Sequence, residues 1–210
     1  MRSRRRRSSR SLSWLGLFIL LAFGGQVWKE TQNRQGTSEP RSGKTTKVFE
    51  VLHEARLHDG PNNDGDSFKI AHQGRVHELR LYFADSPEKR RHSYNGDRLA
   101  DQGRYFGGLG EAQTVAVGRQ AQAFARQWLT SRPFTVYTKW QRVFDSGRHY
   151  AFVVFDDGED LSAKLVREGL ARIHTSGATL PDGRSAARYQ QELRQLETEA
   201  RAARRGGWAR

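Results

Sequence analysis

Carboxylates and an arginine gather in one short stretch of the chain, between Asp64 and Glu88. It reads DGDSFKIAHQGRVHELRLYFADSPE and includes Asp66, Arg80 and Asp85. Crowded like charges raise each other's pKa and cost stability, so such a cluster is tolerated mainly when a cation lies among them. Hard divalent cations such as Ca²⁺ take carboxylate, carbonyl and water oxygens. The stretch therefore predicts a divalent metal site, with Arg80 placed to reach a phosphate.

The acidic residues of this stretch have different expected roles. Strand pairing would bring Asp66 and Asp85 together as two charged ligands, and the backbone carbonyl of Ser86 could add a third. Pro87 makes the following turn rigid. Glu88, just past that turn, is placed to orient or deprotonate a metal-bound water.

Arg80 and Arg148 form the second part of the predicted site. A guanidinium group matches phosphate oxygens with two parallel hydrogen bonds, so two arginines make a clamp. The clamp would stabilise the extra charge of a five-coordinate phosphorus, and uncatalysed phosphodiester cleavage is very slow. Each motif alone has an ordinary reading: DGDS as a turn, a strand arginine as a solvated side chain, and Ser-Pro-Glu as a helix start.

Strands must hold these side chains. Residues 67–71 and 75–84 predict a hairpin around Gly74, in which Arg80 points away from the face of its apolar neighbours. Alternating residues in 47–57 predict one strand with a bulge near His53. Aromatic and β-branched residues predict two further strands, over 134–140 and 149–155.

Three helices are expected beside these strands. They cover 119–129, 161–168 with Asp160 as its N-cap, and 185–205. Five short strands with three helices indicate an α+β domain, most economically a closed five-stranded OB-fold-type β-barrel. Residues 89–118 are basic and rich in glycine, and we expect a long loop there, either a substrate-contacting flap or a plain solvated insertion.

Composition limits the class of protein and its partners. The 210 residues contain no cysteine, which excludes disulfides and thiolate metal sites. The net charge is +13, and six arginines in residues 1–10 leave 13 − 6 = +7 for the rest. A polyanionic partner, either nucleic acid or anionic lipid, is the natural expectation.

The N-terminal region predicts export. Residues 1–28 combine a basic block with a short apolar run, which fits a cleaved signal peptide or a membrane anchor through residues 12–28. The arginines then stay inside, and the catalytic domain lies outside the cytoplasm, anchored in the membrane or secreted into a space such as the periplasm. Residues 29–46 are a polar linker, and residues 47–210 are the folded domain.

The motifs stand in a recognisable order: DGDS, RLYFADSPE, a helix, DSGRHYAFVVF and LSAKLVREGLARI. This order resembles the staphylococcal nuclease (thermonuclease) family over roughly Val48 to Trp208. The resemblance implies a five-stranded OB-type barrel with three helices, and a Ca²⁺-dependent endonuclease that cuts DNA and RNA to 3′-phosphate and 5′-hydroxyl ends. It also implies roles for particular positions here: metal binding by Asp66, Asp85 and the carbonyl of Ser86, support by Asp64, and catalysis by Arg80, Glu88 and Arg148.

The chain departs from the family where nucleotide stacking is expected. Residues 173–177 (IHTSG) stand in place of the family's tyrosines, and Ser146 replaces a loop tyrosine. The insertion after Glu88 is longer and more basic than the family loop. We expect Tyr94, Tyr105 or Phe106 in this insertion to supply the missing stacking surface.

Three functions remain open from sequence alone. The first is an exported or tethered nuclease acting on DNA and RNA, preferably single-stranded or locally open, with no obligate protein partner. The second is a catalytically weak or inactive OB-type module that binds nucleic acid at the membrane. The third is an envelope protein whose basic surface docks anionic lipid. A pure binding module has no reason to keep two metal carboxylates and three catalytic side chains together.

Overall fold

The computed structural model describes residues 49–209. The predicted signal or anchor and the linker therefore lie outside the described residues. Within the described part, no helix is long and apolar enough to cross a membrane.

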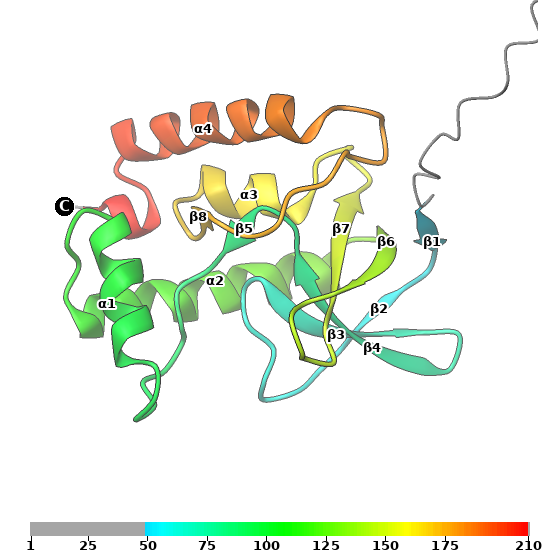
Figure 1. Cartoon of the computed structure of the whole chain (residues 1–210), viewed down its shortest axis with the longest axis horizontal. Coiled ribbons are helices and arrows are strands. Elements are labelled where there is room, and N and C mark those ends of the chain that lie inside the picture. The colour runs from blue at the N-terminus through cyan, green and yellow to red at the C-terminus, as the bar shows by residue number, and fades with distance from the viewer. Residues whose placement is uncertain (1–48, 210) are drawn as a thin grey trace, which may run out of the picture. The chain divides into compact units, whose positions relative to one another are not determined.

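A mixed six-stranded sheet forms one side of the domain, and helices cover its other side (Figure 1). The strand order is β1-β6-β7-β4-β3-β2, with every neighbouring pair antiparallel except β4 and β7. A separate two-stranded sheet pairs β5 with β8. The elements are β1 (Glu50–Leu52), β2 (Arg56–His58), β3 (Ser67–His72), β4 (Arg75–Leu81), β5 (Ala84–Asp85), α1 (Gly96–Tyr105), α2 (Glu111–Ser131), β6 (Phe134–Arg142), β7 (His149–Phe155), α3 (Leu161–Arg167), β8 (Arg172–Ile173), α4 (Ala186–Ala202) and the 3₁₀ turn η1 (Gly206–Trp208).

The α+β class agrees with the sequence prediction and is consistent with an OB-like fold, but the expected closed five-stranded barrel with three helices is not what forms. The single first strand predicted over 47–57 divides at Glu54, whose φ is 57°. Its halves, β1 and β2, pair with β6 and β3 at opposite ends of the sheet. Consecutive strands thus occupy both edges without pairing to each other, and the sheet stays open.

The segment 89–118 is not the structureless loop expected from its glycines. It contains α1, and α2 starts at Glu111, well before the predicted start at 119. Glycine weakens helices locally, so tertiary packing must supply the stability of α1. Leu99 is fully buried, and a Cβ at Gly103 would lie 2.4 Å from the carbonyl oxygen of Leu109. Glycine is needed there because two backbones touch.

A kink after β4 moves the chain off the main sheet. Phe83 has a φ of 64°, and the amide of Ala84 donates to the carbonyl of Tyr82 at 2.8 Å. Both aromatic rings are buried; that of Tyr82 stacks on Tyr150 at 5.0 Å, and that of Phe83 meets Tyr189 edge-on at 5.0 Å. The predicted second hairpin arm therefore ends at Leu81, and the residues beyond it form β5.

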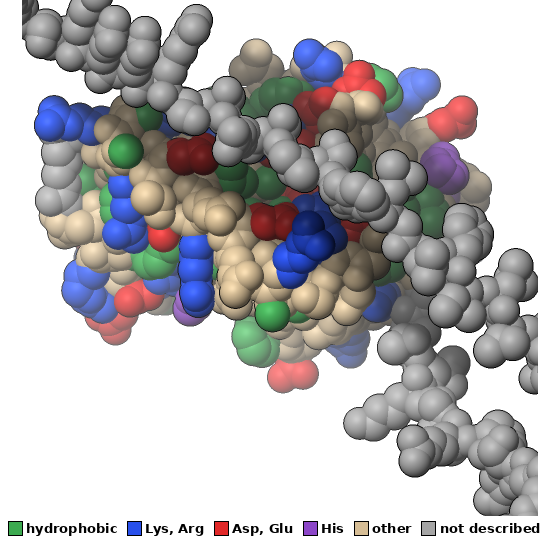
Figure 2. Space-filling view, turned by 90° about the horizontal axis from the view of Figure 1, so that it is seen from above, with side chains coloured by type: hydrophobic (Ala, Val, Ile, Leu, Met, Phe, Trp, Pro, Cys, Tyr) green, Lys and Arg blue, Asp and Glu red, His purple; other side chains and the backbone are tan. Residues whose placement is uncertain are grey.

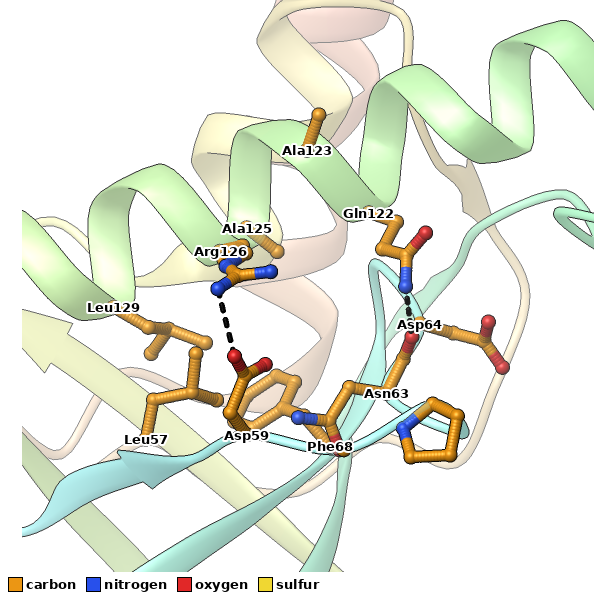
Figure 3. Close-up of a pocket in the computed structure, with 12 residues that line it drawn as sticks. Leu57, Asp59, Asn63, Asp64, Phe68, Gln122, Ala123, Ala125, Arg126 and Leu129 are labelled. Carbon is orange, nitrogen blue, oxygen red and sulfur yellow. Dashed lines mark hydrogen bonds and ion pairs between the residues drawn. The ribbon is translucent and has the colours of Figure 1, made fainter.

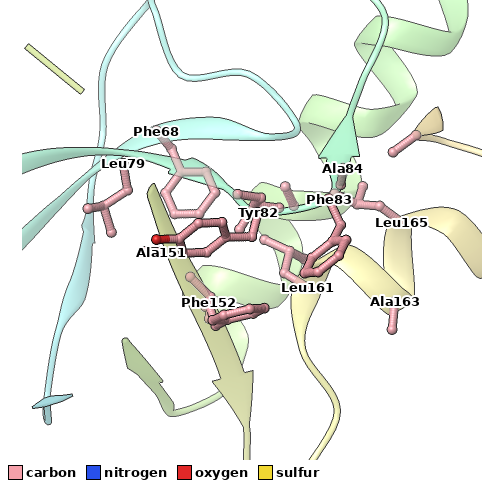
Figure 4. Close-up of a cluster of buried hydrophobic side chains, with 14 of the residues drawn as sticks. Phe68, Leu79, Tyr82, Phe83, Ala84, Ala151, Phe152, Leu161, Ala163 and Leu165 are labelled. Atoms are coloured by element: carbon pink, nitrogen blue, oxygen red, sulfur yellow. The ribbon is translucent and has the colours of Figure 1, made fainter. Parts of the chain in front are cut away.

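One hydrophobic core lies between the sheet and the helices (Figure 4). Strand residues such as Phe68, Leu79 and Phe152 meet Leu161 and Leu165 of α3, and all five are at most 2% exposed. The predicted N-cap of α3 is confirmed, since Asp160 accepts hydrogen bonds from the amides of the two residues that follow Leu161. Burial of this apolar surface, at about 25 cal/mol per Å², holds the sheet that carries the site.

Helix α2 packs directly against the turn after β5. Its buried face consists of small or aliphatic residues, including Val117, Gly118 and Ala121. A Cβ at Gly118 would lie 2.5 Å from the carbonyl oxygens of Pro87 and Glu88. The helix backbone thus touches the turn and fixes the backbone that carries Glu88.

Candidate active site

One cavity of about 810 Å³ gathers side chains from the β2–β3 loop, β4, β5, α1 and the β6–β7 loop. Its lining includes every predicted metal-binding and catalytic residue: Asp64, Asp66, Arg80, Asp85, Ser86, Glu88 and Arg148. Segments far apart in the sequence therefore meet at one hollow, because β4 lies between β3 and β7 in the sheet.

Asp85 is the most enclosed acid of the cavity, with 0% exposure. Its Oδ1 accepts from Arg80 and, at 2.6 Å, from Nη2 of Arg98. Its Oδ2 accepts from Nε of Arg172 at 2.6 Å and from Nε2 of Gln102 at 3.2 Å. A buried carboxylate needs such partners, since an unpaired buried charge is costly.

The pKa values of the two buried aspartates, Asp66 and Asp85, are shifted in opposite directions. Burial acts to raise the pKa of Asp85, but the charges of Arg98, Arg80 and Arg172 outweigh it and lower the pKa to about 2. Burial raises the pKa of Asp66 to about 6 against the charge of Arg80, and the negative charge of Asp85 adds to the rise. Asp85 is the firmly ionised member of the pair, and Asp66 gives up its proton more reluctantly.

Arg80 and Arg148 meet at the hydroxyl of Ser67. Nη1 of each guanidinium lies 3.3 Å from the Ser67 Oγ. Arg80 also pairs with Asp85 and, at 3.4 Å, with Asp66. The two arginines therefore reach the same wall of the cavity, as a clamp on a phosphate requires.

Glu88 contributes its carboxylate from the turn that α2 supports. Its Oε1 accepts from Nε of Arg98 at 2.6 Å, and its amide donates to Oε1 of Gln102 at 3.0 Å. Arg98 thus bridges Glu88 and Asp85. Both Arg98 and Gln102 belong to α1, the helix absent from the sequence prediction.

The donor set suits a divalent cation in kind, because carboxylate and carbonyl oxygens of the predicted ligands line one cavity. As the side chains lie, however, nitrogen donors occupy the carboxylate of Asp85, and the Ser86 carbonyl accepts from Gln102 at 3.1 Å. Among residues 49–209, no group of three or more His, Asp or Glu side chains is arranged to hold a metal. Among the charged partners of Asp85, Arg98 is the most exposed, with a side chain 39% exposed.

Asp64 stands on the loop that separates this cavity from a second one of about 590 Å³ under α2 (Figure 3). In that view its carboxylate points away from the Arg126–Asp59 ion pair of the second cavity. Lys89 Nζ lies 3.0 Å from the carboxylate of Asp64, and Gln122 donates to the carbonyl of Asn63 at 2.7 Å. These contacts tie down the loop that carries the DGDS motif.

Tyr105 and Phe106 do not offer the stacking surface expected from the sequence. Phe106 is fully buried, with its ring 4.9 Å from that of Trp208. The Tyr105 hydroxyl bonds to Glu197, its ring packs on the same two aromatics, and neither residue lines the cavity. They anchor α1 to the C-terminal turn, so their role is in packing.

A different aromatic residue stands at the cavity. Phe144 lines it from the β6–β7 loop, is 86% exposed and has a φ of 47°. His174 of the IHTSG run, with the two residues after it, lines the same cavity. A large exposed ring beside a charged hollow is unusual for a packing residue.

Sequence reasoning missed Arg98, Gln102 and Arg172. A signal existed for the first two, since Leu99, Gly103 and Phe106 follow helical spacing and place Arg98 and Gln102 on neighbouring turns. No local signal distinguishes Arg172, because only the pairing of β8 with β5 places it beside Asp85.

Acidic and basic side chains adjoin each other on the face shown in Figure 2. The lining of the cavity also contains both acidic and basic side chains. Its carboxylates belong to Asp64, Asp66, Asp85 and Glu88, and the cations in or directly behind it are Arg80, Lys89, Arg98, Arg148 and Arg172. Ion pairs with arginine and lysine therefore stabilise the carboxylates of the site, in addition to the packing of the surrounding elements.

Comparison with protein families agrees with this geometry. The model of the staphylococcal nuclease homologue family matches residues 78–210. The chain belongs to the staphylococcal nuclease family, as the order of its motifs predicted. The match includes Arg80, Asp85, Glu88 and Arg148, whereas Asp64 and Asp66 precede it. No curated protein matches the chain. The family is one of nucleases, which act as hydrolases on nucleic acid.

Proposed function

We propose that this protein is a Ca²⁺-dependent endonuclease that hydrolyses phosphodiester bonds in DNA and RNA. The observation that carries the proposal is the meeting of Arg80 and Arg148 at Ser67, in the cavity that also holds Glu88. Two guanidinium groups beside a carboxylate are suited to bind a phosphate and activate a water against it.

In this reaction Arg80 and Arg148 bind the non-bridging oxygens of the scissile phosphate and hold it in line for attack. Their fixed charges favour the five-coordinate phosphorus, which carries more negative charge than the starting diester. When bound, Ca²⁺ supplies charge neutralisation and lowers the pKa of a coordinated water. Asp66, Asp85 and the Ser86 carbonyl are the residues that would hold it.

Glu88 takes the proton from the attacking water. Helix α2 supports the turn that carries its carboxylate, and general-base catalysis typically contributes 10²–10⁴-fold. The new P–O bond forms as the P–O5′ bond breaks, and the departing 5′-oxygen takes a proton from solvent water, which leaves a 3′-phosphate and a 5′-hydroxyl. The cavity is open to solvent at the exposed Phe144, which suits a single-stranded or locally open substrate whose base stacks on that ring.

The N-terminal segment adds a proposal about location. A basic block followed by an apolar run would export the domain and leave it anchored in the membrane or released after cleavage. Protease treatment of intact cells tests this, because an exported domain is digested while a cytoplasmic marker protein survives. Protection of the domain in intact cells would contradict the proposal.

The decisive experiment is digestion of supercoiled plasmid and of RNA by the full chain, with Ca²⁺ and with a chelator. We expect Ca²⁺-dependent nicking, and products that accept a label from polynucleotide kinase at the 5′ end without prior phosphatase. Glu88→Gln should lower kcat by about 10²–10⁴-fold, the contribution expected of a general base. Binding of nucleic acid without cleavage would instead support the inactive OB-type module.

A further inference from the structure

Arg98 lies between the carboxylates of Asp85 and Glu88. In the proposed reaction, Asp85 binds the metal and Glu88 takes a proton from water. The Nε of Arg98 lies 2.6 Å from Oε1 of Glu88, and its Nη2 lies 2.6 Å from Oδ1 of Asp85. One guanidinium therefore holds both the proposed metal ligand and the proposed base. Because it bonds to each through a separate nitrogen, the planar fork fixes the spacing of the two acids.

The three arginines on Asp85 are not equivalent. The side chains of Arg80 and Arg172 are 10% and 6% exposed, whereas that of Arg98 is 39% exposed. Arg80 is set in the sheet and Arg172 in the β5–β8 pair, but Arg98 extends from the first turn of α1. Arg98 is thus the partner that can leave toward solvent without moving a strand.

We propose that Arg98 is an internal cation that competes with the divalent metal for Asp85 and holds Glu88 until the metal enters. Without metal, its charge balances the crowded acids and keeps Glu88 paired. When a divalent cation takes Asp85, the guanidinium swings out, and the same movement frees the Glu88 carboxylate for the attacking water. Metal entry and release of the base are thereby coupled. The inference rests on the proposed function.

Binding of Ca²⁺ tests the competition apart from activity. Calorimetric titration of the full chain compares the wild type with Arg98→Lys, which keeps the positive charge but cannot reach both acids with one planar group. We expect Kd for Ca²⁺ to fall about tenfold in Arg98→Lys, and further in Arg98→Gln, which also loses the charge. If only the positive charge of Arg98 mattered, the Kd for Ca²⁺ would fall in Arg98→Gln and stay unchanged in Arg98→Lys.

A control and a second measurement complete the test. Arg104→Lys alters an arginine of the same helix whose partner, Asp101, lies outside the cavity lining, and it should leave the Kd unchanged. In the wild type, the NMR signal of the Arg98 Nε–H should move on Ca²⁺ titration, because its bond to Glu88 breaks.

Two results would overturn the inference: an Arg98→Lys variant that binds Ca²⁺ as the wild type does, or an Arg98 signal that stays fixed while Ca²⁺ binds. Failure of the proposed function looks different. In that case, no nucleic acid is cut while Ca²⁺ still displaces the guanidinium.

Discussion

The guanidinium groups of Arg80 and Arg148 share one acceptor, the hydroxyl of Ser67, each at 3.3 Å. Arg80 comes from strand β4, and Arg148 is the last residue of the β6–β7 loop, directly before β7. Ser67 opens β3 directly opposite Arg80 in the register of the sheet. A single neutral oxygen thus lies between two like charges and sets their spacing.

Removal of this hydroxyl should loosen the clamp. Ser67→Ala is expected to lower kcat/KM for plasmid DNA about tenfold, because a hydrogen bond to a charged group contributes about 1.5–3 kcal/mol. Ser185→Ala removes the N-cap of α4 instead and should cost about 1 kcal/mol of stability with kcat/KM unchanged. Equal activity in the Ser67→Ala protein would show that the shared acceptor does not position the arginines.

Substitution of the two arginines should have different effects on stability. Within residues 49–209, the side chain of Arg148 bonds only to the hydroxyls of Ser67 and Ser146. Arg148→Lys is therefore expected to lower kcat about 10²–10³-fold with the melting temperature unchanged. Arg80→Lys should lower both, because Asp66 and Asp85 lose a buried partner. An equal drop in melting temperature for both variants would contradict this arrangement.

The exposed ring of Phe144 should contribute to substrate binding and not to the stability of the fold. Phe144→Ala is expected to raise KM for single-stranded DNA about tenfold, since one base–aromatic stack is worth about 1–3 kcal/mol. Stability should not change, because the ring is 86% exposed. Val76→Ala, at a 51% exposed site in the β3–β4 hairpin, serves as the control. An abasic oligonucleotide should show no difference between Phe144→Ala and the wild type, and a difference there would argue against stacking.

Asp160 offers a test of the scaffold away from the cavity. It caps α3 and accepts from the Tyr189 hydroxyl, and burial raises its pKa in the fold. A raised pKa stabilises the fold fully below the ordinary value of 3.8, and that contribution is lost as pH rises through the folded-state value. The free energy of unfolding of the wild type, relative to Asp160→Asn, should therefore fall as pH rises above 3.8.

Denaturant titration at a series of pH values measures that difference. Asp160→Ala removes the cap and leaves the Tyr189 hydroxyl without its acceptor, and should cost about 2 kcal/mol or more at any pH. A constant difference between the wild type and Asp160→Asn across the pH series would show that the carboxyl does not titrate as its burial requires.

Much of the arrangement follows from local sequence. The hairpin around Gly74 and the strong aromatic strands place Arg80 and Arg148, since β-branched and aromatic residues leave few alternatives to strands. The order of motifs identifies the family and names the residues that line the cavity. A bulge was predicted near His53, but the complete division at Glu54 and the kink at Phe83 were not, because a positive φ is uncommon for these residue types and local sequence does not indicate it.

The sequence by itself determined the family and the predicted acids that share a cavity with Arg80 and Arg148. Only the tertiary structure decided what neutralises those acids. Helix α1, which contains two glycines, persists because Leu99 and Gly103 are buried against the body, and it then directs Arg98 onto Asp85 and Glu88. Strand β8 does the same for Arg172. Electrostatic partners of buried charges depend on burial and on long-range pairing, and neither quantity can be read from neighbours along the chain.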